Sequence, residues 1–285
     1  MSRHTVLLMG AGGQVGRALL THAPRGADIV PAGRATCDLS DPAAIADLVG
    51  RVQPDLVINA AAYTAVDAAE SDEAAARAIN ADAVAALAEA HPGRLVHIGT
   101  DFVFDGTAAR PYTPQDAPAP LSVYGATKAA GERHLRKGDL LVRTSWVYAA
   151  HGGNFLHTML RLMTEREEVR VVADQIGAPT WADGLARTIW ALIDAQATGT
   201  FHHRDAGIAS WYDFAVAIQE EARAAGLLDR AVPVIPIATT DYPTPARRPA
   251  CAVLDCTATR DLLGDGYTHW RANLRRMIEE LARSG

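Results

Sequence analysis

Short apolar runs alternate with longer helical patterns through the first half of the chain, and this alternation constrains the fold more than any other feature. The apolar runs occupy residues 5–9, 28–32, 55–61, 94–99 and 140–148. Runs that are apolar on both faces and separated by helices indicate a parallel sheet covered on both sides. Because crossovers between parallel strands are right-handed, they fix much of the strand order. We therefore expect an α/β fold with a doubly wound, Rossmann-type parallel sheet.

The pattern loosens after about Gly199. The rest of the chain contains the run TFHHRD, a helix over residues 210–226, a proline-rich stretch over 233–249 and a C-terminal helix over 268–285. The proline-rich stretch cannot be helical and is expected to form an ordered wrap. We expect a smaller, mixed C-terminal lobe that binds substrate over the carboxyl edge of the sheet. In this division residues 1–150 form the dinucleotide-binding domain, with returns at about 168–196 and 240–256, and residues 151–285 form the remainder.

Composition narrows the class of protein. The chain has 285 residues, 49% of them hydrophobic, which is enough for a large core. Its 33 acidic and 27 basic residues give a net charge of -6, which argues against binding nucleic acid. No apolar stretch could span a membrane and no signal peptide precedes the first strand, so we expect a cytoplasmic protein. Cys37, Cys251 and Cys256 lack CxxC spacing, so we expect reduced thiols and neither a disulfide nor a structural zinc.

A glycine-rich turn comes directly after the first apolar run. The segment GAGGQVG fits GxxGxxG through Gly10, Gly13 and Gly16. A strand, a glycine turn and a helix start direct backbone N–H groups and the positive helix end toward a pyrophosphate. A tight turn without a ligand is the alternative, but at the first strand-to-helix junction of a doubly wound chain we favour a dinucleotide.

The choice of dinucleotide depends on the end of the second strand. Sites for NAD usually carry an acidic residue there, whereas this chain has Gly33 and Arg34. A guanidinium suits a 2′-phosphate, so NADPH is the favoured cofactor, NADH the alternative, and Arg17 a helper. Arg34 as a solvated loop arginine is the other interpretation. Asp38 and Leu39 lie shortly after, at a position that could flank an adenine ring.

Three residues at the same predicted edge of the sheet supply the groups that reduction of a carbonyl by hydride requires. Thr100 ends the fourth apolar run, and Tyr124 and Lys128 lie four apart near the start of a helix. A hydroxyl polarises the carbonyl and a phenol supplies the proton. An ammonium lowers the pKa of the phenol from its usual value of about 10. The spacing of the tyrosine and lysine alone also arises by chance.

With these motifs, the sequence resembles the extended short-chain dehydrogenases/reductases and, in its finer motifs, the dTDP-4-dehydrorhamnose reductase family. The matching segments are GGQVG, INAAAYTAVDAAES, TDFVFDG, VYGATKAAGE, RTSWVYA, GGNFLHTMLRL, DQIGAPT and YPTPARRP. They occur in order from residue 10 to residue 249, so the resemblance covers nearly the whole chain.

The resemblance implies roles for individual residues. Tyr124 would be the proton donor, Lys128 its partner and Thr100 the tuning hydroxyl. The sugar nucleotide would contact Thr100, Asp101 and Trp146, and Arg248 could hold a nucleotide phosphate. The cofactor contacts would be Gly10, Gly13, Gln14, Val15, Asp38, Leu39, Ala62, Tyr63, Thr64, Tyr124 and Lys128. For Trp146 core packing is the alternative, for Arg248 a salt bridge at the rim, and for the alanines near Tyr63 tight packing of a helix on the sheet.

Two positions depart from the family. Gly99 stands where the family often has a serine before the threonine, so one hydroxyl is missing. Ala18 stands where some members carry a glutamate that helps bind magnesium at a dimer interface. We therefore expect no bound metal, and a monomer or a weak homodimer.

The implied activity is reduction of dTDP-4-dehydro-β-L-rhamnose to dTDP-L-rhamnose with hydride from NADPH, the last step of dTDP-L-rhamnose synthesis. The expected partner is this small-molecule dTDP-sugar, with no nucleic acid and no membrane. The fold and the tyrosine–lysine pair alone would also permit another reductase or epimerase of nucleotide-linked sugars. A non-catalytic NADP-binding regulatory subunit, similar to the methionine adenosyltransferase β subunit, is a further alternative.

Overall fold

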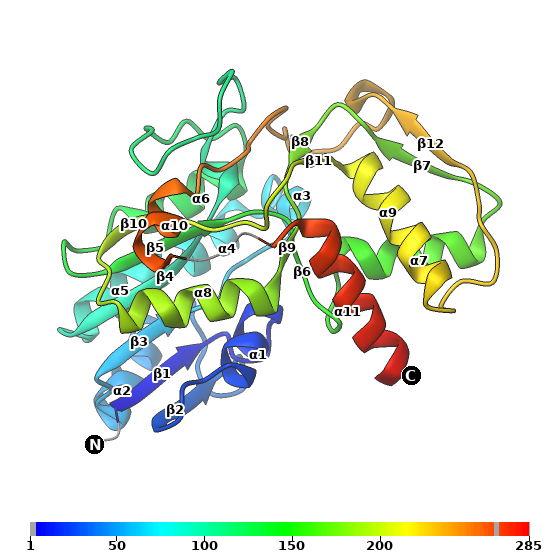
Figure 1. Cartoon of the computed structure of the whole chain (residues 1–285). Helices are drawn as coiled ribbons and strands as arrows, with labels where there is room; N and C mark the ends of the chain where they lie inside the picture. The colour runs from blue at the N-terminus through cyan, green and yellow to red at the C-terminus, as the bar shows by residue number, and fades with distance from the viewer. Residues whose placement is uncertain (1–3, 265–267, 285) are drawn as a thin grey trace.

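The central element is a parallel sheet. The computed structural model describes residues 4–264 and 268–284, and in this part of the chain six strands form one sheet in the order β10-β5-β4-β3-β1-β2 (Figure 1). Their bounds are β1 His4–Met9, β2 Ala27–Ala32, β3 Leu56–Asn59, β4 Arg94–Thr100, β5 Leu140–Thr144 and β10 Gly199–His202. All neighbouring pairs are parallel. The chain steps outward from β1 in both directions, so the expected doubly wound α/β fold is confirmed.

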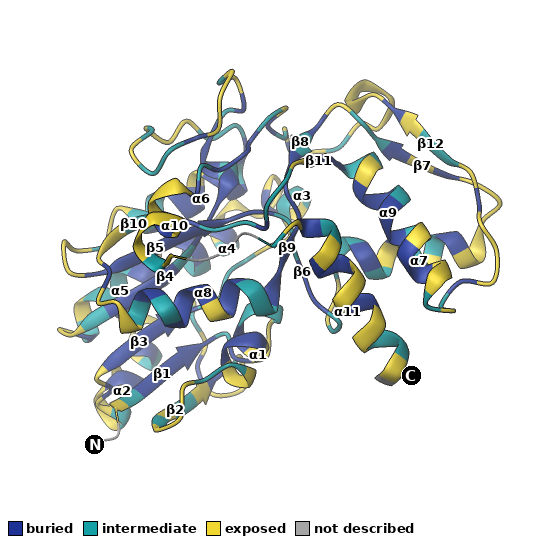
Figure 2. Cartoon of the chain, viewed as in Figure 1, coloured by how far each residue is buried: buried dark blue, intermediate teal, exposed yellow. Residues whose placement is uncertain are grey.

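Helices cover both faces of this sheet. On one face, α1 Gln14–Thr21 and α8 Ala182–Asp194 bury leucine and alanine side chains against alternate strand residues such as Leu8 and Ile58. On the other, α2 Pro42–Val52 and α5 Ala83–Ala90 pack against Leu7, Val57 and their neighbours. Alternate side chains of the strands thus pack into two separate cores, one on each face of the sheet. Figure 2 shows the inner strands, such as β1 and β3, in the dark blue of buried residues.

The alanine-rich helix before β4 is interrupted. It divides into α3 Val66–Ala69, α4 Glu73–Arg77, a π-helical turn η1 Ala78–Asp82, and α5. The side chain of Asp72 accepts a hydrogen bond from Ala75 N and so starts a new helix. In the π-helical turn Asn80 exchanges hydrogen bonds with the backbone of Tyr63. The alanine-rich sequence before Ala90 favours one long helix, but these local caps compete with helix propagation and divide it.

Two short strands also pair differently from the prediction. The run beginning at Thr200 was assigned to the looser second half, but β10 pairs with β5 and extends the central sheet. The run VRVVA lies in the stretch 168–196 that was expected to return to the dinucleotide-binding domain, but β7 Val169–Val172 pairs with β12 Val234–Ile237 in a separate sheet. Both pairings join segments far apart in the chain, and local patterns do not encode them.

The second half builds a lobe with its own core. Its helices are α7 Phe155–Glu165, α9 Trp211–Ala224 and α11 Trp270–Ser284, which Figure 1 shows beside the sheet of β7 and β12. Buried side chains of these helices, among them Met159, Phe214 and Leu274, form one hydrophobic cluster. A capping box of Ser210 and Asp213 fixes the start of α9. The remaining elements are β6 Val147–Tyr148, β8 Ile176–Gly177, β9 Thr180–Trp181, β11 Ala209–Ser210, α6 Val123–Glu132, α10 Thr257–Leu263 and the 3-10 turns η2 Asp101–Val103 and η3 Thr239–Asp241.

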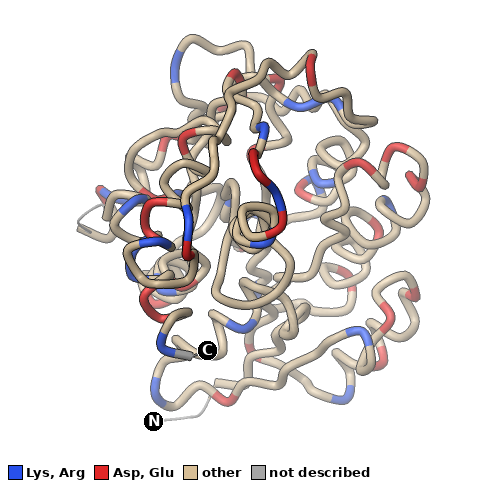
Figure 3. The backbone as a smooth tube through the Cα atoms, turned by 90° about the vertical axis from the view of Figure 1, so that its right-hand side faces the viewer, with Lys and Arg blue, Asp and Glu red and all other residues tan. Residues whose placement is uncertain are grey.

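Three further features concern the surface charges, the apolar content of the helices and the cysteines. Figure 3 shows basic residues interspersed with acidic ones over the side of the molecule that it presents. Among the described residues, no helix is long and apolar enough to cross a membrane. Cys37 and Cys256 are buried, and Cys251 is half-buried.

Candidate functional site

The glycine turn lies against the end of the third strand. Gly10 has a φ of +75°, and a Cβ there would lie 2.6 Å from the backbone nitrogen of Ala61. A Cβ on Gly16 would collide with the carbonyl of Gly10. Glycine is therefore required at both positions by the close approach of the β1–α1 turn, its helix and the end of β3.

The start of α1 can accept an anion. Its N-cap is Gly13, which has no side chain to cap the helix, and its first turn carries no acidic residue. Free N–H groups and the positive helix end suit a pyrophosphate, so these residues fit a dinucleotide. Gln14 Oε1 accepts a hydrogen bond of 2.8 Å from Asn154 Nδ2, which ties the lobe to this turn.

The residues expected near the adenosine ribose come after β2. Arg34 and Asp38 are exposed, and Leu39 is half-buried. Ser40 donates hydrogen bonds to the carboxylate of Asp38 from its hydroxyl, at 2.7 Å, and from its backbone N–H, at 2.9 Å. These bonds lower the pKa of Asp38. Arg17 donates from Nε to the carbonyl of Gly12, so its guanidinium borders the glycine turn.

The tyrosine and lysine lie on a buried helix face. Ser122 caps α6, and Tyr124 and Lys128 lie on it with exposed fractions of 8% and 2%. Thr100 ends β4 and hydrogen-bonds to the Tyr124 phenol. Burial raises the pKa of Tyr124 to about 12 despite this bond, and Asp101 and Glu132 raise it further. The expected lowering of this pKa by Lys128 is not found: Lys128 is not among the groups that shift it, and its Nζ contacts Ile98 and His97 instead.

Lys128 is held from the strand side. Its Nζ lies 2.6 Å from the carbonyl of Ile98 and 3.2 Å from Nε2 of His97. Burial lowers the pKa of Lys128 to about 8, and Glu132 opposes this shift. The lysine is therefore able to exchange a proton near neutral pH.

Asp101 lies beside this group at the start of η2. It is 2% exposed, and the hydroxyl of Thr100 donates to its carboxyl at 3.1 Å. Burial raises the pKa of Asp101 to about 7. At neutral pH this side chain can both donate and accept hydrogen bonds, which suits a sugar hydroxyl.

A cleft opens over these residues. It is lined by Asp101, Phe102, Trp146, Gln175, Ile176, Trp211, Arg248, Pro249 and Ala252. Trp146 has a φ of +46° and stacks on Trp211 with ring centroids 3.6 Å apart. Three of the four residues predicted to bind the sugar nucleotide therefore come together in one cleft. Thr100 lies just beneath, bonded to Asp101.

Arg248 forms an ion pair at the rim of this cleft. It donates to Asp67 at 3.0 and 2.7 Å, and Asp67 also accepts from the backbone of Ala246. The pair joins the proline-rich segment to α3, and it lowers the pKa of Asp67. Both interpretations of Arg248, rim ion pair and phosphate ligand, are compatible with this position.

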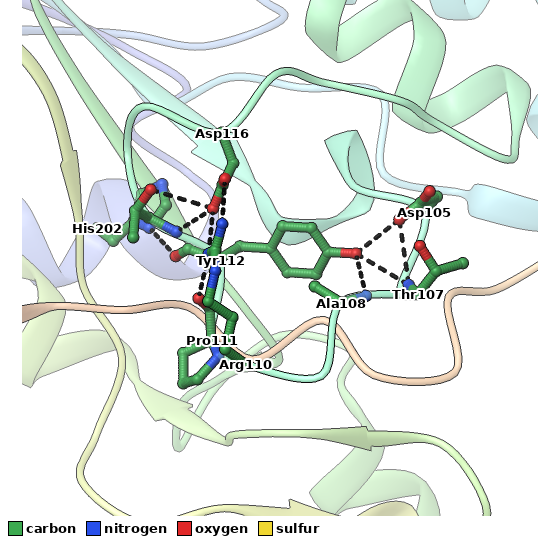
Figure 4. A network of polar contacts seen from close by, with 9 residues as sticks. Asp105, Thr107, Ala108, Arg110, Pro111, Tyr112, Asp116 and His202 are labelled. Carbon is green, nitrogen blue, oxygen red and sulfur yellow. Dashed lines mark hydrogen bonds and ion pairs between the residues drawn. The ribbon is translucent and has the colours of Figure 1, made fainter.

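The segment between η2 and α6 is ordered by a polar network that centres on Tyr112 (Figure 4). The phenol of Tyr112 donates to Asp105 at 2.6 Å and accepts from the backbone of Thr107 and Ala108. Asp116 pairs with Arg110 through two bonds of 2.7 Å. This rigid connection carries the chain from Thr100 to Tyr124.

The missing serine at position 99 has a packing explanation in this chain. A Cβ on Gly99 would lie 2.8 Å from both Arg143 Cγ and Glu132 Oε1. Arg143 and Glu132 form a buried ion pair of 2.8 Å that joins β5 to α6. The glycine therefore leaves room for the pair that anchors the helix of Tyr124 and Lys128.

The sequence patterns did not predict several residues of this region as part of the site. Trp211 starts the helix SWYDF, and its position beside Trp146 depends on tertiary packing. Gln175 lies within DQIGAPT, which was quoted only as a matching segment. Asn59 and His97 are polar residues inside apolar strands; their equivalent positions near the strand ends were the available signal.

Comparisons with known proteins identify the family. The family model described as "RmlD substrate binding domain" matches residues 4–283. A dTDP-4-dehydrorhamnose reductase of Burkholderia thailandensis is 45% identical over 97% of this chain and 98% of its own length. One from Escherichia coli is 42% identical over 97% of both chains. This chain belongs to the dTDP-4-dehydrorhamnose reductase family.

Solved structures agree with this family assignment. The crystal structure of dTDP-4-dehydrorhamnose reductase from Bacillus anthracis, in complex with NADP, has a TM-score of 0.92 and 35% identity and covers 98% of this chain and 99% of that one. A UDP-glucose 4-epimerase of Thermus thermophilus, 17% identical with a TM-score of 0.81, shares the fold.

The position expected for a metal-binding glutamate faces inward in this family member. Ala18 is 1% exposed and packs within the core between α1 and the sheet. Within residues 4–264 and 268–284, no group of three or more His, Cys, Asp or Glu side chains is arranged to hold a metal ion.

Proposed function

We propose that this chain reduces dTDP-4-dehydro-β-L-rhamnose to dTDP-L-rhamnose with NADPH, the last step of dTDP-L-rhamnose synthesis. The observation that carries the proposal is the cleft in which Asp101, Trp146 and Arg248 converge and whose lining residue Phe102 packs against Tyr124. The family membership and the NADP in the Bacillus anthracis relative support the substrate and the cofactor. Residues 1–150 would supply the cofactor crevice, and residues 151–285 most of the lobe that encloses the sugar.

The cofactor is held by the first three strand ends. Gly13 would lie against the pyrophosphate, the N–H groups of Gln14 and Val15 would bind it, and Arg34 would bind the 2′-phosphate. Asp38 and Leu39 would flank the adenine, and Ala62, Tyr63 and Thr64 would lie along the remainder. When bound, the reduced nicotinamide supplies the hydride for C4 of the sugar.

Tyr124 supplies the proton. Its pKa of about 12 keeps the phenol protonated at neutral pH, so it is ready to donate as negative charge develops on the sugar oxygen. Thr100 polarises the carbonyl, and Lys128 is the adjacent acid that can restore the proton. Trp146 and Asp101 hold the sugar, and the guanidinium of Arg248 accepts a phosphate in exchange for part of its contact with Asp67.

The test is the oxidation of NADPH and of NADH by the wild-type protein on adding dTDP-4-dehydro-β-L-rhamnose. Substrate-dependent oxidation with formation of dTDP-L-rhamnose is expected, faster with NADPH. Oxidation with other nucleotide-linked 4-keto sugars alone would favour a different reductase. Binding of NADPH without oxidation would favour a regulatory subunit.

A further inference from the structure

A buried hydrogen-bond chain runs from β3 through β4 to the lysine of the site. Asn59 and His97 are paired neighbours near the ends of these strands, with exposed fractions of 1% and 0%. Asn59 Nδ2 lies 3.2 Å from His97 Nδ1, and His97 Nε2 lies 3.2 Å from Lys128 Nζ. The roles assigned so far to Thr100, Tyr124 and Lys128 do not explain these two side chains.

The direction of this chain is fixed at its first link. The backbone N–H of Ala61 donates to Asn59 Oδ1 at 3.1 Å, so the amide oxygen faces Ala61 and the NH₂ group faces His97. Nδ1 of His97 must then accept, since a proton there would oppose another donor. The imidazole is neutral and fully buried, and burial holds its pKa well below the usual value. Its single proton therefore sits on Nε2 and points at Lys128.

Only one form of the lysine satisfies this geometry. A neutral amine can accept the Nε2–H of His97 with its lone pair and donate to the carbonyl of Ile98, 2.6 Å away. An ammonium group has no lone pair, so its N–H groups would oppose the N–H of His97. We propose that Asn59 and His97 form a relay that presents an N–H donor to Lys128 and favours its neutral form, which makes His97 a positioning residue for proton transfer.

Other charged groups near Lys128 do not supply this preference. The groups around it are Tyr124 and Glu132 on its own helix, Asp101 on η2, and Arg143 on β5, which pairs with Glu132. From η1 the neutral side chain of Asn80 contacts α6 through Thr127, while Arg77 and Asp82 pair at the surface. Glu132 favours the charged form of Lys128. Burial and the N–H donor of His97 both favour the neutral form and oppose the effect of Glu132.

The consequence for catalysis rests on the proposed function. Tyr124 loses a proton to the sugar oxygen and becomes a phenolate, and an ammonium at Lys128 can replace that proton. The neutral amine that remains on Lys128 accepts a hydrogen bond from Nε2–H of His97, which already points at it. The relay therefore makes Lys128 a stronger acid than an ordinary lysine, and it moves no proton itself.

The chain offers an unusually direct test, because it contains only two lysines, Lys128 and the exposed Lys137. Isotope-labelled lysine gives two NMR signals, and Lys137 serves as the internal reference. We expect the Lys128 amine to titrate near pH 8 in the free protein. We expect labelled His97 to show an unprotonated Nδ1 and a protonated Nε2, its signal being assigned by its loss in His97→Gln. A protonated Nδ1, or a Lys128 midpoint above pH about 10, would overturn the proposal.

Two variants test the direction of the hydrogen bond between His97 and Lys128: one should reverse it and the other should keep it. In Asn59→Asp the carboxylate accepts from Nδ1–H of His97, so Nε2 becomes an acceptor, and the Lys128 midpoint should rise by more than about one pH unit. His97→Gln keeps an N–H donor and should change the midpoint little. His91→Gln, which removes another buried histidine, is the control. If Asn59→Asp is folded and leaves the midpoint unchanged, the relay is wrong; if it does not fold, the wild-type signals still decide.

These measurements need neither cofactor nor substrate. A low Lys128 midpoint in a protein that does not reduce the dTDP-sugar would contradict the proposed function alone. An ordinary midpoint in an active reductase would contradict the relay alone.

Discussion

The proposed cofactor crevice and the proposed sugar cleft, which would meet at Tyr124, are built in different ways. The proposed crevice consists mainly of backbone at the ends of β1, β2 and β3, with glycines that permit close approach and a few exposed side chains such as Arg34. The cleft consists of side chains from segments between Asp101 and Ala252, brought together by the lobe. Substitutions of side chains should therefore have large effects at the cleft and at the catalytic pair, and small effects in the crevice.

The largest effect is expected where the two regions meet. Tyr124→Phe removes the acid with little change in volume and should lower kcat by about 10²–10⁴-fold. Binding of NADPH, measured by fluorescence titration, should be retained because the crevice binds through backbone. Turnover equal to that of the wild type would show that the proton donor is another group.

The pH dependence of kcat should follow Lys128. Burial lowers its pKa to about 8, so the ammonium form is lost as pH rises through that value. Below about pH 8 the lysine is charged and can resupply the proton. At pH about 10 the rate should be about 100-fold lower. A profile that stays flat to about pH 10 in a protein that remains folded would contradict this assignment.

The packing beneath the catalytic helix gives the next largest effect. Gly99→Ser places a Cβ against Arg143 and Glu132 and should lower the free energy of unfolding by about 1–3 kcal/mol. The matched control is Gly138→Ser, since nothing lies within 4 Å of a Cβ there. Urea denaturation measures both. Equal stability of the two variants would mean that the Glu132–Arg143 pair adapts to the serine.

The sugar cleft is tested through its paired tryptophans. Trp211→Ala removes the ring on which Trp146 stacks and should raise the KM for the dTDP-sugar about tenfold. The KM for NADPH should stay within about twofold, because the crevice does not use this ring. Trp211→Phe keeps an aromatic surface and serves as the conservative control. A larger change for NADPH than for the sugar would reverse the assignment of the two regions.

The smallest effect is expected in the crevice itself. Arg34 is exposed, so its ion pair with a 2′-phosphate should contribute about 1 kcal/mol. Arg34→Ala should raise the KM for NADPH about fivefold and leave that for NADH unchanged. Steady-state kinetics with both nicotinamides give the comparison. Equal changes in the KM values for NADPH and NADH would contradict a contact between Arg34 and the 2′-phosphate.

The contrast between the regions also explains what the sequence could predict. The crevice was predictable because its parts come directly after apolar strands, and glycines mark the turn at Gly10 and Gly16. Tyr124 and Lys128 were predictable because their spacing is local. The cleft was predicted only through family resemblance, since Trp146 and Arg248 are distant in the chain.

Other features lay beyond local patterns altogether. The stacking of Trp211 on Trp146 and the pairing of β10 with β5 depend on contacts between distant segments. The raised pKa of Tyr124 was missed because its main cause is burial of the phenol, which the sequence does not reveal. Burial and hydrogen-bond direction are properties of the folded molecule.

The central claim is that the cleft and the crevice act together in one reduction. The most direct measurement is the absorbance of NADPH on mixing the wild-type protein with dTDP-4-dehydro-β-L-rhamnose. The account predicts a loss of absorbance that depends on the sugar and matches the dTDP-L-rhamnose formed. No loss, from folded protein that binds NADPH, would contradict it.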